Sequence, residues 1–225
     1  KDLTNFLNSA GAKIKWKGRT CLVTGVNSLN EISFSVMADR IETGTFCVAA
    51  TIAKGDLEIQ NSNPKVIKTE LNILKRAGAK IKVLENKICI KGPKVIKPIK
   101  NLKTKEWPGV ATDMQSQIMV LMCVANGESS IIENIFENRF LHVGELQRLG
   151  AKIKIKNNKA TIQGNTKFIG AELMSSDLRA SVALVLAAMV SRGKSIINRI
   201  YHLDRGYEDI EKKLRRIGVR IKRLK

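Results

Sequence analysis

Apolar residues recur at helical spacing in four stretches of the chain, and each stretch ends at a glycine. The glycines lie about 70 residues apart, at Gly11, Gly78, Gly150 and Gly218. A stripe of this kind packs one face of a helix against a core. Glycine just past the stripe is a common helix stop, because it adopts the left-handed conformation without a side-chain clash. The pattern predicts four amphipathic helices in an internal repeat.

After each of these glycines the chain alternates between basic and apolar residues. A period of two is typical of a half-buried β-strand. After the first three glycines a polar turn and a second strand follow, as in residues 79–84, 85–86 and 87–90. We expect the basic residues to be solvated and the intervening apolar residues to face the core, namely Ile14, Trp16, Ile81, Val83, Ile153, Ile155 and Ile221.

Three other segments are apolar nearly all round, and each begins with an aspartate. They start at Asp39, Asp113 and Asp177 and end at Gly55, Gly127 and Gly193. A helix without a polar face belongs in the interior of a protein. Strand-like runs follow within residues 56–60, 129–136 and 195–201. The pattern therefore predicts three buried helices, each leading into a strand.

The two kinds of helix combine into a unit of helix, two strands, linker, helix and strand. We predict an α/β (α+β) fold in which buried helices are surrounded by sheets and amphipathic helices. Residues 38–225 are expected to form one domain of three units, at 38–110, 111–174 and 175–225. Residues 1–37 are expected to be the tail of a preceding domain, so the chain looks truncated at its front.

Composition and charge narrow the class of protein. The chain has 225 residues and 44% hydrophobic content, which suits a globular core. Its longest apolar run, residues 180–190, is too short to span a membrane, and no signal peptide is recognisable. Much of the net charge of +20 lies on predicted strand faces, and only 4% of residues are aromatic. We expect a cytoplasmic protein with neither a membrane nor a nucleic-acid partner.

The cysteines and histidines receive structural interpretations. Cys21, Cys47, Cys89 and Cys123 lie far apart in apolar patterns, without the paired spacing of a zinc site. We expect them to be buried thiols in a reducing cytoplasm, and we expect no metal. The two histidines, His142 and His202, are expected to be satisfied packing residues.

Residues suited to chemistry gather at the starts of the three buried helices. An aspartate there is ordinarily an N-cap that accepts the first free amide hydrogens. Helix N-termini also favour anions, and guanidinium groups bind phosphate or carboxylate in bidentate fashion. Four arginines stand at or near helix starts or strand ends: Arg40, Arg139, Arg179 and Arg205. We predict a site for a small polyanionic ligand, in which a carboxylate can act as a general base.

Five strings in these stretches carry a family resemblance. They are Asp39-Arg40-Ile41-Glu42-Thr43-Gly44-Thr45-Phe46, Thr112-Asp113-Met114-Gln115, Ile135-Phe136-Glu137-Asn138-Arg139-Phe140, Asp177-Leu178-Arg179-Ala180-Ser181 and Tyr201-His202-Leu203-Asp204-Arg205-Gly206-Tyr207. In this order they closely resemble the UDP-N-acetylglucosamine enolpyruvyl transferase family, whose bacterial members open peptidoglycan precursor synthesis. The resemblance extends over essentially the whole chain.

The resemblance implies a two-domain transferase in which each domain is an inside-out α/β barrel of three repeated units. The implied reaction moves the enolpyruvyl group of phosphoenolpyruvate to the 3-hydroxyl of UDP-N-acetylglucosamine and releases phosphate, without a cofactor. The implied partners are these two substrates and the N-terminal half of the same enzyme. Cytoplasmic location and a part in cell wall biogenesis, cell shape, the cell cycle and cell division follow from the same resemblance.

The resemblance also implies roles for individual residues. Asp113 matches the base that takes the proton of the 3-hydroxyl, and Asp177 matches a second carboxylate near the reacting carbon. Ile135 matches a position whose backbone contacts the sugar nucleotide. Three arginines, Arg139, Arg179 and Arg205, match residues around phosphoenolpyruvate. A weaker match, Arg40, has a place that can be structural in domain closure, and Asp39 is expected to be a cap.

Two departures and two alternatives stand beside this resemblance. Ala38 and Ala111 replace prolines that the family usually has before its strings. The family's lysine-asparagine pair and its acid-bearing loop have no counterpart, so we expect the isolated chain to be inactive. One alternative is the shikimate-pathway sister enzyme, whose Asp-His-Arg and Lys-Glu-Ser-Asp-Arg strings are absent. The other is a non-catalytic protein that binds a sugar nucleotide or nucleic acid.

Overall fold

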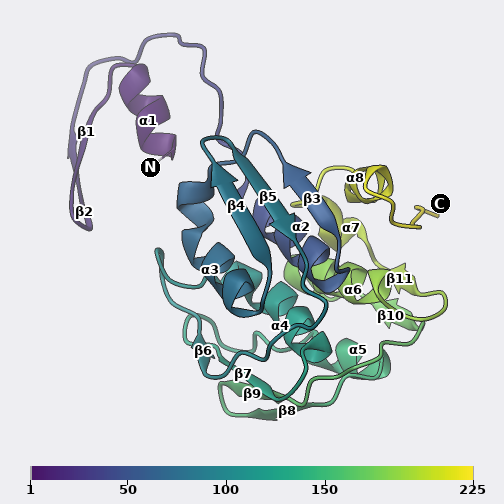
Figure 1. Cartoon of the computed structure of the whole chain (residues 1–225). Coiled ribbons are helices and arrows are strands. Elements are labelled where there is room, and N and C mark those ends of the chain that lie inside the picture. The colour runs from purple at the N-terminus through teal and green to yellow at the C-terminus, as the bar shows by residue number, and fades with distance from the viewer. Residues whose placement is uncertain (1, 225) are drawn as a thin grey trace. The chain divides into compact units, whose positions relative to one another are not determined.

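The chain divides into two compact units, residues 1–38 and 39–225, and the computed structural model describes residues 2–224 (Figure 1). The smaller unit contains α1 (Asp2–Ser9) and an antiparallel hairpin of β1 (Lys13–Lys17) and β2 (Thr20–Thr24). The indole of Trp16 donates a hydrogen bond of 3.1 Å to the Thr4 hydroxyl, which ties the hairpin to the helix. That this unit belongs to a preceding domain stays a prediction.

The larger unit contains three successive sets of elements. The first set is α2 (Arg40–Ile52), β3 (Asp56–Ile59), the 3-10 helix η1 (Pro64–Ile67), α3 (Lys68–Arg76), β4 (Lys80–Leu84) and β5 (Lys87–Lys91). The second is β6 (Leu102–Lys103), the 3-10 helix η2 (Thr112–Met114), α4 (Gln115–Val124), β7 (Ser129–Ile132), α5 (Val143–Arg148), β8 (Ile153–Lys156) and β9 (Lys159–Ile162). The third is β10 (Glu172–Met174), α6 (Leu178–Met189), β11 (Ile196–Asn198), α7 (Tyr201–Asp204) and α8 (Ile210–Arg216).

Each set contributes a sheet whose apolar residues are in register. The order is β3-β5-β4 in the first sheet, β6-β7-β9-β8 in the second and β10-β11 in the third. In the first, Leu57 and Ile81 both stand opposite Ile90. In the second, Ile131 and Ile155 both stand opposite Ala160. Helix α2 packs against β3 and β5, and α4 packs against β7 and β9, so these two sheets cover the buried helices.

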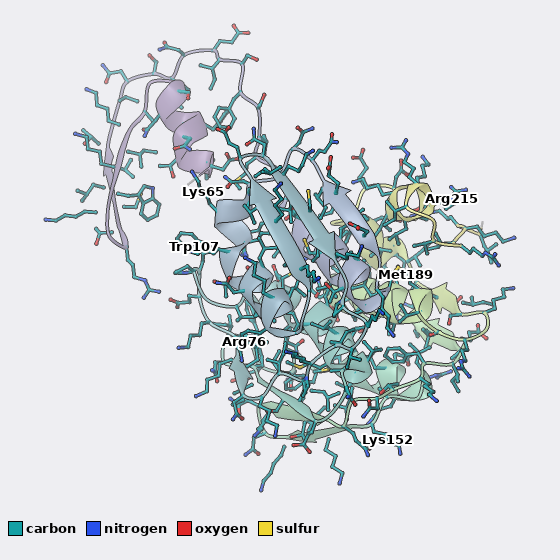
Figure 2. The ribbon with its side chains drawn as sticks, in the orientation of Figure 1. Lys65, Arg76, Trp107, Lys152, Met189 and Arg215 are labelled. Carbon is teal, nitrogen blue, oxygen red and sulfur yellow. The ribbon has the colours of Figure 1, made fainter. Side chains whose placement is uncertain are left out.

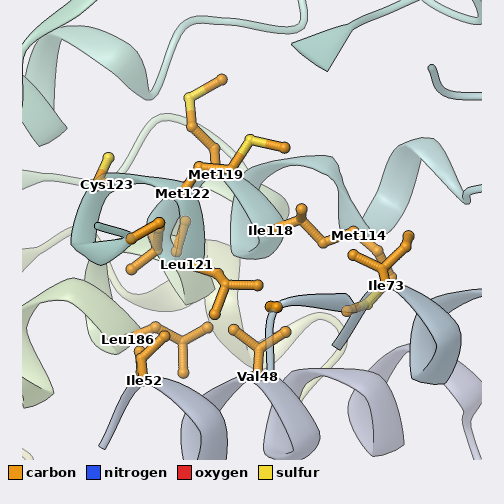
Figure 3. Packing of buried hydrophobic residues seen from close by; sticks show 14 of the residues in the cluster. Val48, Ile52, Ile73, Met114, Ile118, Met119, Leu121, Met122, Cys123 and Leu186 are labelled. Carbon is orange, nitrogen blue, oxygen red and sulfur yellow. The ribbon is translucent and has the colours of Figure 1, made fainter. Parts of the chain in front are cut away.

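Helices α2, α4 and α6 form the interior, as their all-round apolar pattern predicted. Most residues of the three are buried: 10 of 13 in α2, 9 of 10 in α4 and 8 of 12 in α6. Figure 3 shows Val48 of α2, Leu121 of α4 and Leu186 of α6 within one buried cluster. Helices α2, α4 and α6 are 13, 10 and 12 residues long. No helix among residues 2–224 is long and apolar enough to cross a membrane.

The predicted strand faces are confirmed for the basic residues but only in part for the apolar ones. Lys152, Lys154 and Lys156 are exposed, and Figure 2 shows the side chain of Lys152 at the outside of the ribbon. Ile153 is buried as predicted. The prediction was wrong for Trp16, Val83 and Ile155, which are about half exposed (48%, 46% and 48%). Each lies near a hairpin turn, where burial along the strand has already fallen off.

The stretch after Gly218 differs from the prediction of a strand. Gly218 ends α8 with a φ of +95°, as the glycine pattern predicted. Residues 219–224 pair with no neighbouring strand in the described part of the chain, and Ile221 is only half-buried. The period of two thus marked a segment that is not part of a sheet among the described residues.

The cysteines divide into two pairs. Cys47 and Cys123 are buried as predicted, and burial raises the pKa of each thiol to about 12. The prediction was wrong for Cys21, which is exposed, and for Cys89, which is half-buried. Cys21 is exposed because every residue of β2 is exposed.

Truncation of Leu121 tests whether α4 is the centre of the core. Leu121 is 1% exposed among the three buried helices, so Leu121→Ala removes buried methyl groups and leaves a cavity. We expect a loss of about 2 to 5 kcal/mol in the free energy of unfolding, measured by urea denaturation. The control is Leu84→Ala, since Leu84 is 43% exposed at the end of β4, with an expected loss of at most about 1 kcal/mol. Equal losses in the two variants would contradict this core.

Candidate functional site

The three aspartates that start the buried segments differ in what their carboxylates do. Asp39 caps α2 by accepting a hydrogen bond of 2.8 Å from the Ile41 amide. Asp177 caps α6 by accepting bonds from the amides of Arg179 and Ala180, at 2.8 and 3.0 Å. Asp113 lies within η2, before α4 begins, and its side chain caps neither helix. Of the three carboxylates, only that of Asp113 forms ion pairs among the described residues.

The Asp113 carboxylate is shared by two guanidinium groups. Arg139 Nη2 donates to Oδ1 at 2.9 Å, and Arg179 Nη2 donates to Oδ2 at 2.8 Å. All three side chains are partly exposed, at 34% for Asp113, 27% for Arg139 and 18% for Arg179. Charge-assisted bonds of this length are strong and directional. The group carries one net positive charge and is accessible, so it can receive an anion.

Arg179 connects the carboxylates of Asp177 and Asp113. Its backbone amide donates a hydrogen bond to Asp177, and its guanidinium group donates one to Asp113. Burial alone raises the pKa of Asp177. The amides of Ala180 and Arg179, the Ser176 hydroxyl and the charge of Arg139 outweigh burial and hold that pKa below its usual range. Asp177 is therefore a charged, immobile cap at neutral pH.

Arg139 is held in place by the turn after β7. Asn138 adopts a left-handed conformation with a φ of +52°, which asparagine tolerates better than most residues. The Arg139 guanidinium lies over the Phe136 ring, 5.5 Å from its centroid. Such a cation–π contact orients the guanidinium. The sequence Phe-Glu-Asn-Arg thus places a cation beside Asp113.

His142 lies beneath this site. It is 3% exposed, and burial lowers its pKa to about 4, with the charges of Asp177 and Arg139 acting in opposite directions. It shares a hydrogen bond with the Arg139 backbone, while its Nε2 has no partner among the described residues. His142 is a packing residue as predicted, but the prediction that its polar atoms are satisfied was wrong. His202 likewise has a buried Nε2 without a partner among residues 2–224.

A buried polar network fixes the starts of the three helices relative to one another. The Ser116 hydroxyl donates to the Arg179 carbonyl at 2.9 Å and so joins α4 to α6. Gln117 Nε2 donates to the Thr45 hydroxyl at 3.2 Å and so joins α4 to α2. Thr45 and the Tyr207 hydroxyl lie 2.8 Å apart. The side chains of Ser116, Gln117, Thr45 and Tyr207 are all buried, and the bond from Ser116 holds the helix that follows Asp113 against Arg179.

The other predicted residues lie around this centre without bonding to it. Arg40 points to the buried Glu70, at 3.9 Å, and Glu70 also accepts a bond from the Ala111 amide at 3.4 Å. Arg205 is exposed at the end of α7. Among the described residues, no hydrogen bond or ion pair joins Arg40, Ile135 or Arg205 to Asp113.

Gly206 places the Arg205 backbone beside the start of α6. A Cβ atom on Gly206 would lie 2.8 Å from a methyl carbon of Leu178, a separation that real Cβ atoms do not show. Glycine thus lets α7 approach the first residue of α6. Arg205 and Arg179 are the chain neighbours of these two residues.

Glu133 is the residue that sequence reasoning missed. It follows β7, is 3% exposed, and accepts hydrogen bonds from both Thr112 and Ile135. The one signal was its position two residues before the Ile135 string. Its burial could not be read from a stretch expected to be a strand.

The two best-formed cavities do not include this centre. Their volumes are about 870 and 420 Å³, and the larger one is lined by α6, β11 and the segment 219–224. Among residues 2–224 no three histidine, cysteine or acidic side chains lie close enough to hold a metal ion. Asp113 and its arginines form an open, positively charged face.

A protein-family model decides the relationship of this chain. The model described as EPSP synthase (3-phosphoshikimate 1-carboxyvinyltransferase) matches residues 1–214. The chain belongs to the EPSP synthase family. The matched stretch includes Asp113, Arg139 and Arg179.

Curated relatives in this family carry another substrate in their names. A UDP-N-acetylglucosamine 1-carboxyvinyltransferase from Pelagibacter ubique is 58% identical over all 225 residues, which cover 54% of its length. Proteins of the same name from Desulfosudis oleivorans and Geobacter metallireducens are 50% and 49% identical, over 53% and 54% of their lengths. The chain spans about half the length of the curated relatives it matches.

Solved structures of the family confirm the predicted fold. The enolpyruvyl transferase NikO from Streptomyces tendae matches 98% of this chain and 53% of its own, with a TM-score of 0.87 and 27% identity. An EPSP synthase from Acinetobacter baumannii matches 99% of this chain and 55% of its own, with a TM-score of 0.80 and 18% identity. The α/β arrangement of repeated units around buried helices is therefore the enolpyruvyl transferase fold.

The pKa of His142 gives a test of the burial beneath the site. An unfolded histidine has a pKa near 6.5, and the folded value of about 4 means that the unfolded chain binds a proton first as the pH falls. We expect the folded state to lose about 3 kcal/mol between these two pH values because of this group. NMR titration of the His142 ring should give a midpoint near 4, and His142→Phe should flatten this part of the stability profile. A midpoint near 6.5 would contradict the burial.

Proposed function

We propose that this chain is part of an enzyme that transfers the enolpyruvyl group of phosphoenolpyruvate to the 3-hydroxyl of UDP-N-acetylglucosamine. The observation that carries the proposal is the Asp113 carboxylate held between Arg139 and Arg179, at 2.9 and 2.8 Å. It supplies a base and two phosphate- or carboxylate-binding cations at one point. The names of the most similar relatives supply the substrates.

Asp113 acts as the base in the first step. Its carboxylate takes the proton of the sugar 3-hydroxyl while that oxygen bonds to C2 of phosphoenolpyruvate. The C3 methylene gains a proton from a general acid that none of these 225 residues supplies. A tetrahedral adduct results, which loses a proton from C3 and phosphate from C2 to give the enolpyruvyl ether. Asp177 stands near the reacting carbon as a second carboxylate.

The arginines act electrostatically in both steps. Arg139, Arg179 and Arg205 meet the phosphate and carboxylate of phosphoenolpyruvate and stabilise the charge that develops on the leaving phosphate. In the free chain two of these cations are occupied by Asp113. An incoming dianion competes for them, and the Asp113 oxygens become available to the sugar hydroxyl. The pairing thus keeps the base and its cations ordered until the substrates arrive.

Two further residues complete the proposed binding site. The Ile135 amide donates to Glu133 at 2.8 Å, so the Ile135 carbonyl is its backbone group for the sugar nucleotide. Arg40 contributes from the start of α2, where its pairing with Glu70 steadies the segment before Asp113. The remaining half of the longer enzyme is the partner that supplies the general acid. We further propose that the enzyme works in the cytoplasm in peptidoglycan synthesis, and so in cell shape and division.

Transfer to 3-phosphoshikimate is less well supported. The similarity to the EPSP synthase of Acinetobacter baumannii, at 18% identity, carries the fold alone. The relatives named for UDP-N-acetylglucosamine are 45 to 58% identical. The Asp-His-Arg and Lys-Glu-Ser-Asp-Arg strings of the sister enzyme are also absent from the chain.

Replacement of the base tests the proposal in a full-length chimera, in which the 225 residues replace the matching stretch of the Pelagibacter ubique relative. We expect the chimera to release phosphate from phosphoenolpyruvate only when UDP-N-acetylglucosamine is present. Asp113→Asn keeps the shape of the side chain but accepts no proton. Its turnover should fall by at least about 10²-fold while sugar-nucleotide binding is partly kept.

Asp39→Asn is the matched control, because asparagine caps a helix about as well as aspartate. Its turnover should stay near that of the unmodified chimera. The isolated 225 residues should show no turnover, since they lack the general acid. Near-normal turnover of the Asp113→Asn chimera would remove Asp113 from the mechanism, and phosphate release with shikimate 3-phosphate instead would reassign the substrate.

A further inference from the structure

We propose that Glu133 is a positioning residue that fixes, through one buried carboxylate, both the turn that carries Asp113 and the segment from Ile135 to Arg139. The inference rests on the proposed function for its kinetic consequences. Its geometric basis is independent of that function. Glu133 touches neither substrate in the proposal, and it acts through Thr112 and Ile135.

The Glu133 carboxylate accepts four hydrogen bonds from three parts of the chain. Oε1 accepts from the Thr104 hydroxyl at 2.8 Å, from the Ile135 amide at 2.8 Å and from the Phe136 amide at 3.2 Å. Oε2 accepts from the Thr112 hydroxyl at 2.9 Å. The side chain is 3% exposed, so water does not replace these donors. Both oxygens are satisfied, and satisfied buried networks are rigid.

The first arm of this network holds the turn after β7. The Thr104 hydroxyl accepts a hydrogen bond of 2.8 Å from the Asn134 amide and donates one to Glu133. The amides of residues 134, 135 and 136 are thereby all fixed by Glu133 and Thr104. Main-chain bonds from Thr104 to Ile132, and from Glu133 to Asn158, anchor the network to the sheet. These bonds therefore position the Ile135 carbonyl and the start of the turn that carries Arg139.

The second arm holds the Asp113 turn. Thr112 is the residue before Asp113, and its hydroxyl is bound to Glu133 Oε2. Asp113 has no capping bond of its own to fix its backbone. The bond from Thr112 therefore contributes to the position of the proposed base. A displacement of 1 Å in a reacting group can cost about 10²-fold in rate.

The two arms predict separable kinetic effects. Loss of the Thr112 hydroxyl loosens only the Asp113 turn, which should lower kcat. Loss of the whole carboxylate also frees the amides of residues 135 and 136, which should raise KM for the sugar nucleotide as well. A role confined to stability would lower the melting temperature and the active fraction, and it would leave kcat and KM per active site unchanged.

The test uses Thr112→Val, Glu133→Leu and Glu133→Gln in the full-length chimera, with active sites counted by titration. We expect Thr112→Val to lower kcat about 10-fold, with KM for UDP-N-acetylglucosamine changed less than about 2-fold. Glu133→Leu should lower kcat and raise this KM, each by about 10-fold. Glu133→Gln should recover most of both losses, because its amide oxygen accepts the backbone donors and its NH₂ group can donate to the Thr112 hydroxyl.

Glu128→Gln is the matched control, since Glu128 is exposed just before β7, and its kinetics should not change. Unchanged kcat and KM per active site in both Thr112→Val and Glu133→Leu would overturn the proposal. If the unmodified chimera has no transferase activity, the proposed function fails instead. Amide hydrogen exchange in the 225-residue chain then decides on positioning: faster exchange at Ile135 and Phe136 in Glu133→Leu supports it, and unchanged exchange overturns it.

Discussion

The sharing of one carboxylate by two guanidinium groups is the interaction on which the candidate site depends. Asp113 can pair with Arg139 and Arg179 only because it lies in a 3-10 turn, where its side chain is not used as a cap. The equivalent aspartates, Asp39 and Asp177, each use one carboxylate oxygen to accept hydrogen bonds from the first amides of α2 and α6. The internal repeat thus placed three acids at similar positions, and local backbone geometry left the carboxylate of Asp113 free to pair with arginines.

The buried helices determine where this pairing occurs. Their side chains pack in one core, while Ser116, Gln117, Thr45 and Tyr207 hydrogen-bond across their N-terminal ends. Apolar packing sets the distance between the helices, and the polar bonds set their relative position along the axis. The glycine at 206 and the Asn138 turn then bring α7 and the Arg139 segment to the same end of the bundle. The packing of the interior helices therefore determines the geometry of the candidate site.

Sequence reasoning reached most of the fold because periodicity records burial directly. The all-round apolar runs after Asp39, Asp113 and Asp177 became buried helices, and the glycine stops at Gly78 and Gly150 ended amphipathic ones. It failed where burial depends on distance from a neighbouring element. Val83 and Ile155 lie toward hairpin turns, and residues 219–224 lack a pairing strand.

For the site, the sequence pattern identified the charged residues. It did not predict which of them form ion pairs with one another in the folded chain. It grouped Asp113 with the arginines, and the geometry then separated Arg139 and Arg179, which bond to it, from Arg40, which faces Glu70. Glu133 was missed because its importance comes from burial and from donors about 21 and 29 residues away, Thr112 and Thr104. No local sequence motif predicts hydrogen bonds between residues so far apart in the chain.

The most direct measurement of the central claim is a crystal structure of the full-length chimera with UDP-N-acetylglucosamine bound. The account predicts that the sugar 3-hydroxyl lies within hydrogen-bonding distance of an Asp113 oxygen, at about 2.6 to 3.2 Å. A sugar bound elsewhere, or a 3-hydroxyl directed away from Asp113, would contradict it.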